Sequence, residues 1–170
     1  MLEQIFEKEK IEYLNLDLLH PFENNPFQSV DESEYDELRD SVKEFGIITP
    51  LIVNKSENGY EIISGHRRWQ IAKELNLESV PVYVREFSKE EAIINFVDCN
   101  LSREKILPSE KARAYKMKHD AIKKQGARTD LTSSQVGTKF RSDEILAETM
   151  PDSRMQIQRY IRLNPFTSLA

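Results

Sequence analysis

The 170-residue chain has one cysteine, Cys99, and three histidines. A lone cysteine forms neither an intrachain disulfide nor a CxxC metal site, and the scattered histidines lack zinc-ligand spacing. Disulfide scaffolds and zinc modules are therefore excluded, and we expect a reducing, cytoplasmic environment. Glycine is also scarce, with 5 residues, and the GxxxxGK[ST] pattern of a P-loop does not occur.

Long hydrophobic segments are missing as well. No apolar run approaches the ~20 residues that cross a bilayer, and a mean hydropathy of −0.59 is typical of a soluble protein. Residues 1–10 mix Glu and Lys with few apolar side chains, unlike a secretory signal. No cluster of carboxylates indicates a two-metal nuclease site. The length suits one or two small domains with a buried core.

Charge is divided unevenly along the chain. Residues 1–100 hold 10 basic and 21 acidic side chains, whereas residues 101–170 hold 14 basic and 8 acidic ones. Such an asymmetry favours a polyanion as the partner of the basic half. A solvated helical surface explains the same composition equally well.

The first hundred residues predict a mixture of strands and helices. Strands are expected at residues 11–19, 51–53, 60–64 and 80–85, and helices at residues 31–45 and 67–75. Asn58-Gly59 is a hairpin signal, and Gly46 ends the first helix. Pro81 places its strand at an edge of the sheet, because proline has no N–H to donate.

Beyond residue 87 the pattern becomes helical. Ser88 and Glu91 form a capping box, which predicts a helix with Phe96 on its apolar face. A longer helix is expected over residues 108–124 and is ended by Gln125-Gly126-Ala127, and short helices follow from about residue 136. The expected organisation is a tail at 1–10, an α+β domain at 11–101 and a helical domain at 102–170.

Ser64-Gly65-His66-Arg67-Arg68 lies where a predicted strand ends and a predicted helix begins. Backbone N–H groups at a helix N-terminus favour anions, glycine allows close approach, and arginine side chains match phosphate oxygens. We interpret this turn as a phosphate site. A hairpin turn with a solvated or salt-bridged basic pair is the alternative.

Asn100 shares the expected buried face of its helix with Phe96, four residues earlier. A buried amide needs a hydrogen-bond partner, which is either a ligand or the backbone of a neighbouring loop. Cys99 is expected to be a packing residue rather than a nucleophile, because no His or Lys beside it in the sequence lowers its pKa.

Two short helices joined by a tight turn are predicted at about residues 142–163. Ser142 caps the first helix, and Met150-Pro151-Asp152 breaks it. A second capping box, Ser153 and Gln156, then opens a helix with Ile157 on its inner face. This arrangement is typical of a helix-turn-helix that reads DNA.

The outer face of the second helix carries side chains that suit DNA contacts. Arginine contacts guanine and glutamine contacts adenine in the major groove, and further basic residues contact phosphates. The candidate DNA-binding residues are Ser153, Arg154, Gln156, Gln158, Arg159 and Arg162. A small amphipathic bundle element with charged outer positions is the alternative.

Five segments, in this order and spacing, resemble the ParB/Spo0J-type partition protein family. They are residues 25–28, 44–53, 59–72, 100–104 and 107–115, within a resemblance that covers about residues 11–163. The resemblance implies an α+β fold, in which a small mixed-sheet ParB/sulfiredoxin-like N-terminal domain precedes an all-α helix-turn-helix domain. It also implies a DNA-binding protein of chromosome, plasmid or mobile-element segregation that is switched by CTP.

The resemblance further implies the residues of a nucleotide site and the binding partners. Gly46, Thr49 and Pro50 would line the base pocket. The triphosphate would contact Ser64, Gly65, His66, Arg67 and Arg68, and Asn100 and Arg103 would complete the site. CTP would carry Mg²⁺ on its phosphates. The implied partners are duplex DNA at a centromere-like site, a second copy in a homodimer and a ParA-type ATPase, with the protein on the nucleoid and away from membranes.

The chain departs from the family pattern at several positions. His66 replaces a glutamate of the phosphate motif, and Cys99 replaces the glutamate that precedes Asn100. Because two groups that could activate water are missing, we expect weak or absent CTP turnover, with unknown catalytic residues. Pro151 stands where the helix-turn-helix turn commonly has glycine. Seven residues follow Leu163, so we expect the family's C-terminal dimerisation domain to be absent, as in a fragment of a longer protein.

Other functions of related folds stay open. One is a transcriptional regulator without nucleotide switching, and another is a small-molecule kinase resembling the free-serine kinase. Sulfiredoxin chemistry needs a cysteine in the phosphate loop, where this chain has His66.

Overall fold

A computed structural model of the chain describes residues 10–27, 32–101, 106–130 and 152–163. These residues fall into two compact units. The first contains residues 10–25 and 32–87, and the second contains residues 26–27 and the described residues from 88 onward.

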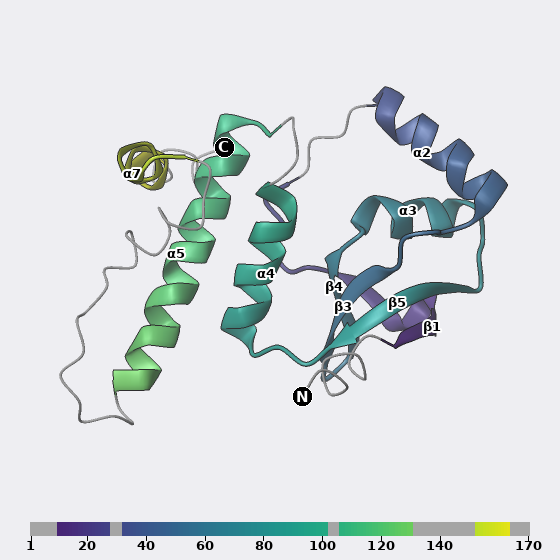
Figure 1. Cartoon of the computed structure of the whole chain (residues 1–170), viewed down its shortest axis with the longest axis horizontal. Helices are drawn as coiled ribbons and strands as arrows, with labels where there is room; N and C mark the ends of the chain where they lie inside the picture. The colour runs from purple at the N-terminus through teal and green to yellow at the C-terminus, as the bar shows by residue number, and fades with distance from the viewer. Residues whose placement is uncertain (1–9, 28–31, 102–105, 131–151, 164–170) are drawn as a thin grey trace. The chain divides into compact units, whose positions relative to one another are not determined.

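The first unit is built on a five-stranded sheet with the strand order β1-β5-β3-β4-β2 (Figure 1). Its strands are β1 (Ile11–Asn15), β2 (Leu19–Pro21), β3 (Leu51–Ser56), β4 (Gly59–Ser64) and β5 (Ser79–Arg85). The pairs β1–β5 and β3–β4 are antiparallel, whereas β2–β4 and β3–β5 are parallel. The expected mixed sheet of an α+β fold is confirmed.

Two α-helices accompany this sheet, α2 (Glu32–Phe45) and α3 (His66–Glu74). Acidic residues begin α2 and Lys43 lies in its last turn, so these charges suit the helix dipole. Gly46 ends α2 with a φ of 72°, and its N–H donates to the carbonyl of Val42 at 2.9 Å. Both helices lie where their hydrophobic spacing predicts them.

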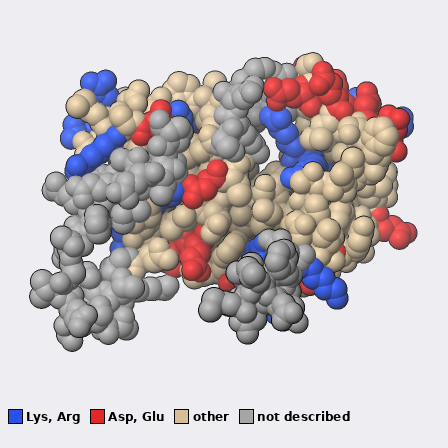
Figure 2. Space-filling view, viewed as in Figure 1, with Lys and Arg blue, Asp and Glu red and all other residues tan. Residues whose placement is uncertain are grey.

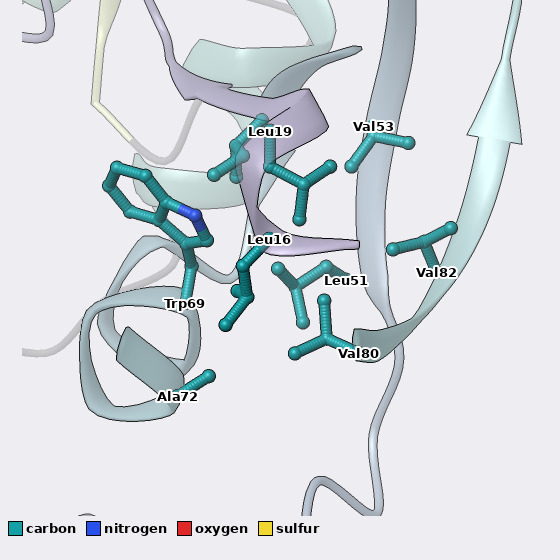
Figure 3. Close-up of a cluster of buried hydrophobic side chains, with 9 residues drawn as sticks. Leu16, Leu19, Leu51, Val53, Trp69, Ala72, Val80 and Val82 are labelled. Atoms are coloured by element: carbon teal, nitrogen blue, oxygen red, sulfur yellow. The ribbon is translucent and has the colours of Figure 1, made fainter. Parts of the chain in front are cut away.

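The core of the first unit lies between α3 and the sheet (Figure 3). Trp69 and Ala72 of α3 pack with Leu51 and Val53 of β3 and with alternate residues of β5. The fully buried valines of β5 are Val80 and Val82, which point to one face because side chains alternate along a strand. This packing fixes the start of α3 at the end of β4.

Two expectations for the strands were wrong. The strand expected at residues 11–19 is interrupted by a short 3-10 helix, η1 (Leu16–Leu18), because the Asn15 side chain accepts a hydrogen bond from the N–H of Asp17 at 3.0 Å. β5 is not an edge strand, since it lies between β1 and β3. Pro81 is tolerated there because β3 pairs with β5 only from Val82 onward, which leaves β1 as the neighbour of the proline.

The second unit contains the helices α4 (Lys89–Leu101), α5 (Pro108–Asp130) and α7 (Arg154–Leu163). The predicted capping box of α4 is confirmed: the N–H of Ser88 donates to Oε2 of Glu91 at 2.9 Å, and the N–H of Glu91 donates to Oγ of Ser88 at 3.3 Å. Among these described helices, none has the length and apolar character that a membrane crossing requires.

The helix α5 is longer than expected. It continues through Gly126 to Asp130, so the predicted end at residues 125–127 was wrong. A single glycine costs only about 1 kcal/mol in a helix interior and does not by itself end the helix. Lys118 of α5 is almost fully buried, and its Nζ lies 2.6 Å from Oδ1 of Asp98 on α4. This ion pair fixes the register of the two helices.

Candidate functional site

The turn between β4 and α3 places a glycine directly before the first residue of α3. Gly65 is the N-cap residue of α3 with a φ of 103°, where other residues are strained. A Cβ atom at this position would lie 2.8 Å from Cγ of Leu51 and 3.2 Å from Nη2 of Arg68. Both the φ angle and the lack of room for a Cβ atom therefore require glycine at this position.

The start of α3 also favours an anion. The first N–H groups of a helix have no partner inside the helix, and the Gly65 cap supplies no side chain to accept from them. The positive end of the helix dipole adds to this preference. Arg67 and Arg68 follow at once, so backbone and side-chain donors are available at one turn.

Arg68 joins this turn to the loop that follows α2. Its Nη1 donates to the carbonyl of Thr49 and to the carbonyl of Pro50, the latter at 3.1 Å. Burial lowers the pKa of the Arg68 guanidinium from its ordinary value, and arginine nevertheless stays charged at neutral pH. Four candidate nucleotide residues, Thr49, Pro50, Gly65 and Arg68, are thereby brought together within the first unit.

Arg67 contacts the acidic helix α2. Its Nη1 lies 3.2 Å from Oε2 of Glu34, and its buried Nε makes no hydrogen bond within the described part of the chain. Figure 2 shows acidic side chains gathered over α2. The Nε–H of Arg67 is therefore an available donor, and an anionic ligand could replace Glu34 as the partner of the guanidinium.

His66 has an additional structural contact. The ring is buried, with 8% of its surface exposed, and its Nε2 accepts a hydrogen bond from the N–H of Phe22 at 3.2 Å. An accepting Nε2 places the proton of a neutral imidazole on Nδ1. Where the family pattern has a glutamate, this chain thus has a ring that joins the residue after β2 to the start of α3.

Three further candidate nucleotide residues lie in the described part of the chain. Gly46 is exposed after α2, and Ser64 is the half-buried last residue of β4. Asn100 belongs to the second unit, is 3% exposed, and donates from Nδ2 to the carbonyl of Phe96 at 2.7 Å. Its observed partner is therefore the backbone of its own helix. Arg103 lies outside the described residues.

Cys99 is exposed, so its expected role as a packing residue is not confirmed. Partial burial and the neighbouring Asp98 raise the pKa of its thiol. A raised pKa keeps the thiol protonated at neutral pH, which makes Cys99 a poor nucleophile. Among the described residues, no group of three or more His, Cys, Asp or Glu side chains could hold a metal ion.

The helix α7 carries the candidate DNA-binding residues. Ile157 is fully buried on its inner face, and the ring of Tyr160 lies 5.7 Å from the ring of Tyr115 on α5. The exposed candidates are Ser153, Arg154, Gln156, Arg159 and Arg162, whereas Gln158 is half-buried. The first helix of the predicted helix-turn-helix, with its turn at Pro151, lies outside the described residues.

The capping box of α7 is confirmed and involves Gln156 directly. Oε1 of Gln156 accepts from the N–H and from the hydroxyl of Ser153, both at 3.0 Å. The N–H of Gln156 donates in return to Oγ of Ser153 at 3.4 Å. Bidentate recognition of adenine needs the same amide oxygen, so Gln156 could read a base in that way only by giving up the cap.

A polar cluster at the start of α7 was missed by the sequence interpretation. The Asp152 carboxylate accepts from the hydroxyl of Tyr115 and lies 2.6 Å from Nζ of Lys111. Lys111 and Tyr115 are four residues apart on α5, a spacing that places them on one helix face. That spacing was the available signal, but it does not identify a partner 37 residues away in the chain.

Comparison with known proteins identifies the family. The family model of the ParB N-terminal domain matches residues 2–101. Stage 0 sporulation protein J of Bacillus subtilis is 36% identical over 158 residues, which cover 92% of this chain and 49% of that protein. The chain spans about half the length of the curated relatives it matches.

Two solved structures of Caulobacter crescentus ParB, C-terminally truncated, share the fold. The complex with CTP-γ-S has a TM-score of 0.50 at 23% identity and covers 91% of this chain and 78% of that one. The complex with the centromeric parS site has a TM-score of 0.58 at 22% identity and covers 89% and 71%. With its N-terminal domain matched over 100 residues, this chain belongs to the ParB/Spo0J family of chromosome-partitioning proteins.

Proposed function

We propose that this chain binds CTP at the phosphate turn of residues 64–68 and duplex DNA through α7, and that CTP binding switches its hold on DNA. The turn and its two arginines are the observation that carries the nucleotide part. The ParB of Caulobacter crescentus, which shares the fold, has been solved with CTP-γ-S, and this supports a nucleoside triphosphate as the anion.

In this proposal, each part of the site has its own task. The N–H groups at the start of α3 and the guanidinium of Arg67 would bind the phosphates, while Arg68 holds the loop of residues 46–50 in place through two carbonyls. The resemblance to the family adds Asn100 and Arg103 as further candidate nucleotide residues. Mg²⁺ would be held by the phosphates.

The DNA part depends on the exposed face of α7. Three arginines, Arg154, Arg159 and Arg162, are exposed there, while Ile157 anchors the opposite face. Arginine contacts both guanine edges and phosphates, and the Caulobacter protein has been solved on its centromeric site. We propose a centromere-like duplex as the target and segregation of a chromosome, plasmid or mobile element as the process.

Hydrolysis is expected to be weak or absent. His66 accepts from the backbone of Phe22 and its ring is buried, and Cys99 carries a thiol with a raised pKa. Neither replaces a carboxylate that positions water. The proposal also includes a homodimer, a ParA-type ATPase partner and a place on the nucleoid in the cytoplasm.

The test measures binding to DNA with and without CTP. A duplex is first enriched by the full chain from a random-sequence pool, and its affinity is then measured by fluorescence anisotropy with no nucleotide, with CTP and with ATP. We expect CTP, and not ATP, to change the affinity or the dissociation rate. Equal binding under all three conditions would contradict the switch and favour a regulator without nucleotide switching.

A further inference from the structure

The polar cluster of Asp152, Tyr115 and Lys111 lies where α7 begins. Asp152 directly precedes Ser153, the capping residue of α7. Its carboxylate accepts from the Tyr115 hydroxyl and pairs with Lys111 at 2.6 Å. The side chains of Lys111 and Asp152 are 23% and 17% exposed, and Tyr115 is fully buried. The cluster is therefore largely shielded from water.

The carboxylate is held in its charged form. Burial alone would raise the pKa of Asp152, but the hydrogen bonds from Lys111 and Tyr115 outweigh burial and lower this pKa from its ordinary value. Burial and Asp152 raise the pKa of Tyr115, so its hydroxyl remains a donor. Charge-assisted hydrogen bonds of this kind are directional and stronger than neutral ones.

Three other features of the packing of α7 are less directional. Ile157 is buried, the rings of Tyr115 and Tyr160 are 5.7 Å apart, and Nζ of Lys111 lies 5.7 Å from the centre of the Tyr160 ring. Apolar packing of this kind attaches a helix but tolerates small rotations, whereas hydrogen bonds lose strength when their angle changes. The cluster thus fixes one end of α7.

We propose that Asp152 is a positioning residue for DNA recognition, which sets the direction of α7 on α5 and thereby aims Arg154 and the exposed arginines that follow it. This inference rests on the proposed DNA binding through α7. The Asp152 carboxylate itself would repel DNA phosphates. If its role is positioning, its removal weakens binding to the enriched duplex. If its role is purely electrostatic, its removal strengthens binding.

The experiment compares two carboxylates of the second unit. Asp152→Asn removes one negative charge and weakens the cluster. Asp120→Asn removes the same charge from α5, where Asp120 pairs with Lys116 at 2.9 Å and is 43% exposed. Both variants are measured on the enriched duplex and on a scrambled duplex. Circular dichroism and the thermal midpoint establish that each variant is folded.

We expect Asp152→Asn to bind the enriched duplex roughly tenfold more weakly, the order expected from one charge-assisted hydrogen bond. Its affinity for the scrambled duplex should stay the same or rise, so the ratio of the two affinities falls. Asp120→Asn should leave that ratio unchanged. A merely destabilised helix would lower both affinities together.

Tyr115→Phe is the second variant, because it removes one hydrogen bond without changing the charge. It should lower the same ratio by a smaller factor, and it keeps the test decisive if Asp152→Asn does not fold. If both variants fold, an unchanged ratio of the two affinities in both would overturn the inference. If only Tyr115→Phe folds, an unchanged ratio in that variant would overturn it. A wild-type chain that enriches no duplex would contradict the proposed function, and with it the inference.

Discussion

The guanidinium of Arg67 and the carboxylate of Glu34 lie 3.2 Å apart and join the first turn of α3 to the first turn of α2. In the proposed function this same guanidinium binds a phosphate. The carboxylate therefore competes with the nucleotide, and nucleotide binding would release one contact between the two helices.

Glu34→Gln should tighten CTP binding by a factor of about two to five, because a half-exposed ion pair of this kind contributes at most about 1 kcal/mol. Isothermal titration calorimetry measures the effect. Asp36→Asn is the matched control, since Asp36 pairs with Arg39 at 3.0 Å on the same helix. Equal affinities for wild type and Glu34→Gln would show that this carboxylate does not compete.

Arg68→Ala should destabilise the first unit, because the carbonyls of Thr49 and Pro50 lose their donor. We expect a loss of about 1–3 kcal/mol in the free energy of unfolding, measured in urea. Arg39→Ala removes a half-exposed arginine of α2 and should cost less than about 0.5 kcal/mol. Similar losses in the two variants would contradict a bracing role for Arg68.

Gly65→Ala should destabilise the chain more than Gly46→Ala. Both glycines have positive φ angles, but a Cβ atom would meet Leu51 at position 65 and nothing within 4 Å at position 46. We expect about 2–4 kcal/mol for Gly65→Ala and about 1 kcal/mol for Gly46→Ala. Urea unfolding of both variants tests this order, and the reverse order would refute the close packing of the turn.

Ser153→Ala should shorten or fray α7, because it removes the side chain that caps the N–H of Gln156. The expected loss is about 1 kcal/mol in the free energy of unfolding. Gln156→Glu should retain stability, since glutamate serves equally well in a capping box. A large loss in Gln156→Glu with none in Ser153→Ala would be incompatible with the observed cap.

Much of the fold follows from local sequence signals. The spacing of apolar residues predicts α2 almost to its ends, and the pairs Ser88–Glu91 and Ser153–Gln156 predict two helix starts that the hydrogen bonds confirm. These features depend on residues three or four positions apart, where a sequence pattern is informative.

The features that sequence did not predict depend on distant residues. Pro81 predicts an edge strand, but β1, which comes from the start of the first unit, pairs with β5 and covers the edge that would otherwise be free. The partners of Arg67 and Asp152 are 33 and 37 residues away along the chain. For Asn100 the sequence predicts either a ligand or the backbone of a neighbouring loop as its partner, whereas the observed carbonyl belongs to its own helix.

The most direct test of the account is the affinity of the wild-type chain and of Arg67→Ala for CTP, measured by calorimetry beside ATP, GTP and UTP. Wild type should bind CTP most tightly, and Arg67→Ala should lose at least about tenfold in affinity with an unchanged thermal midpoint. Undiminished CTP binding by the variant, or no binding of any triphosphate by wild type, would contradict the assignment of the β4–α3 turn.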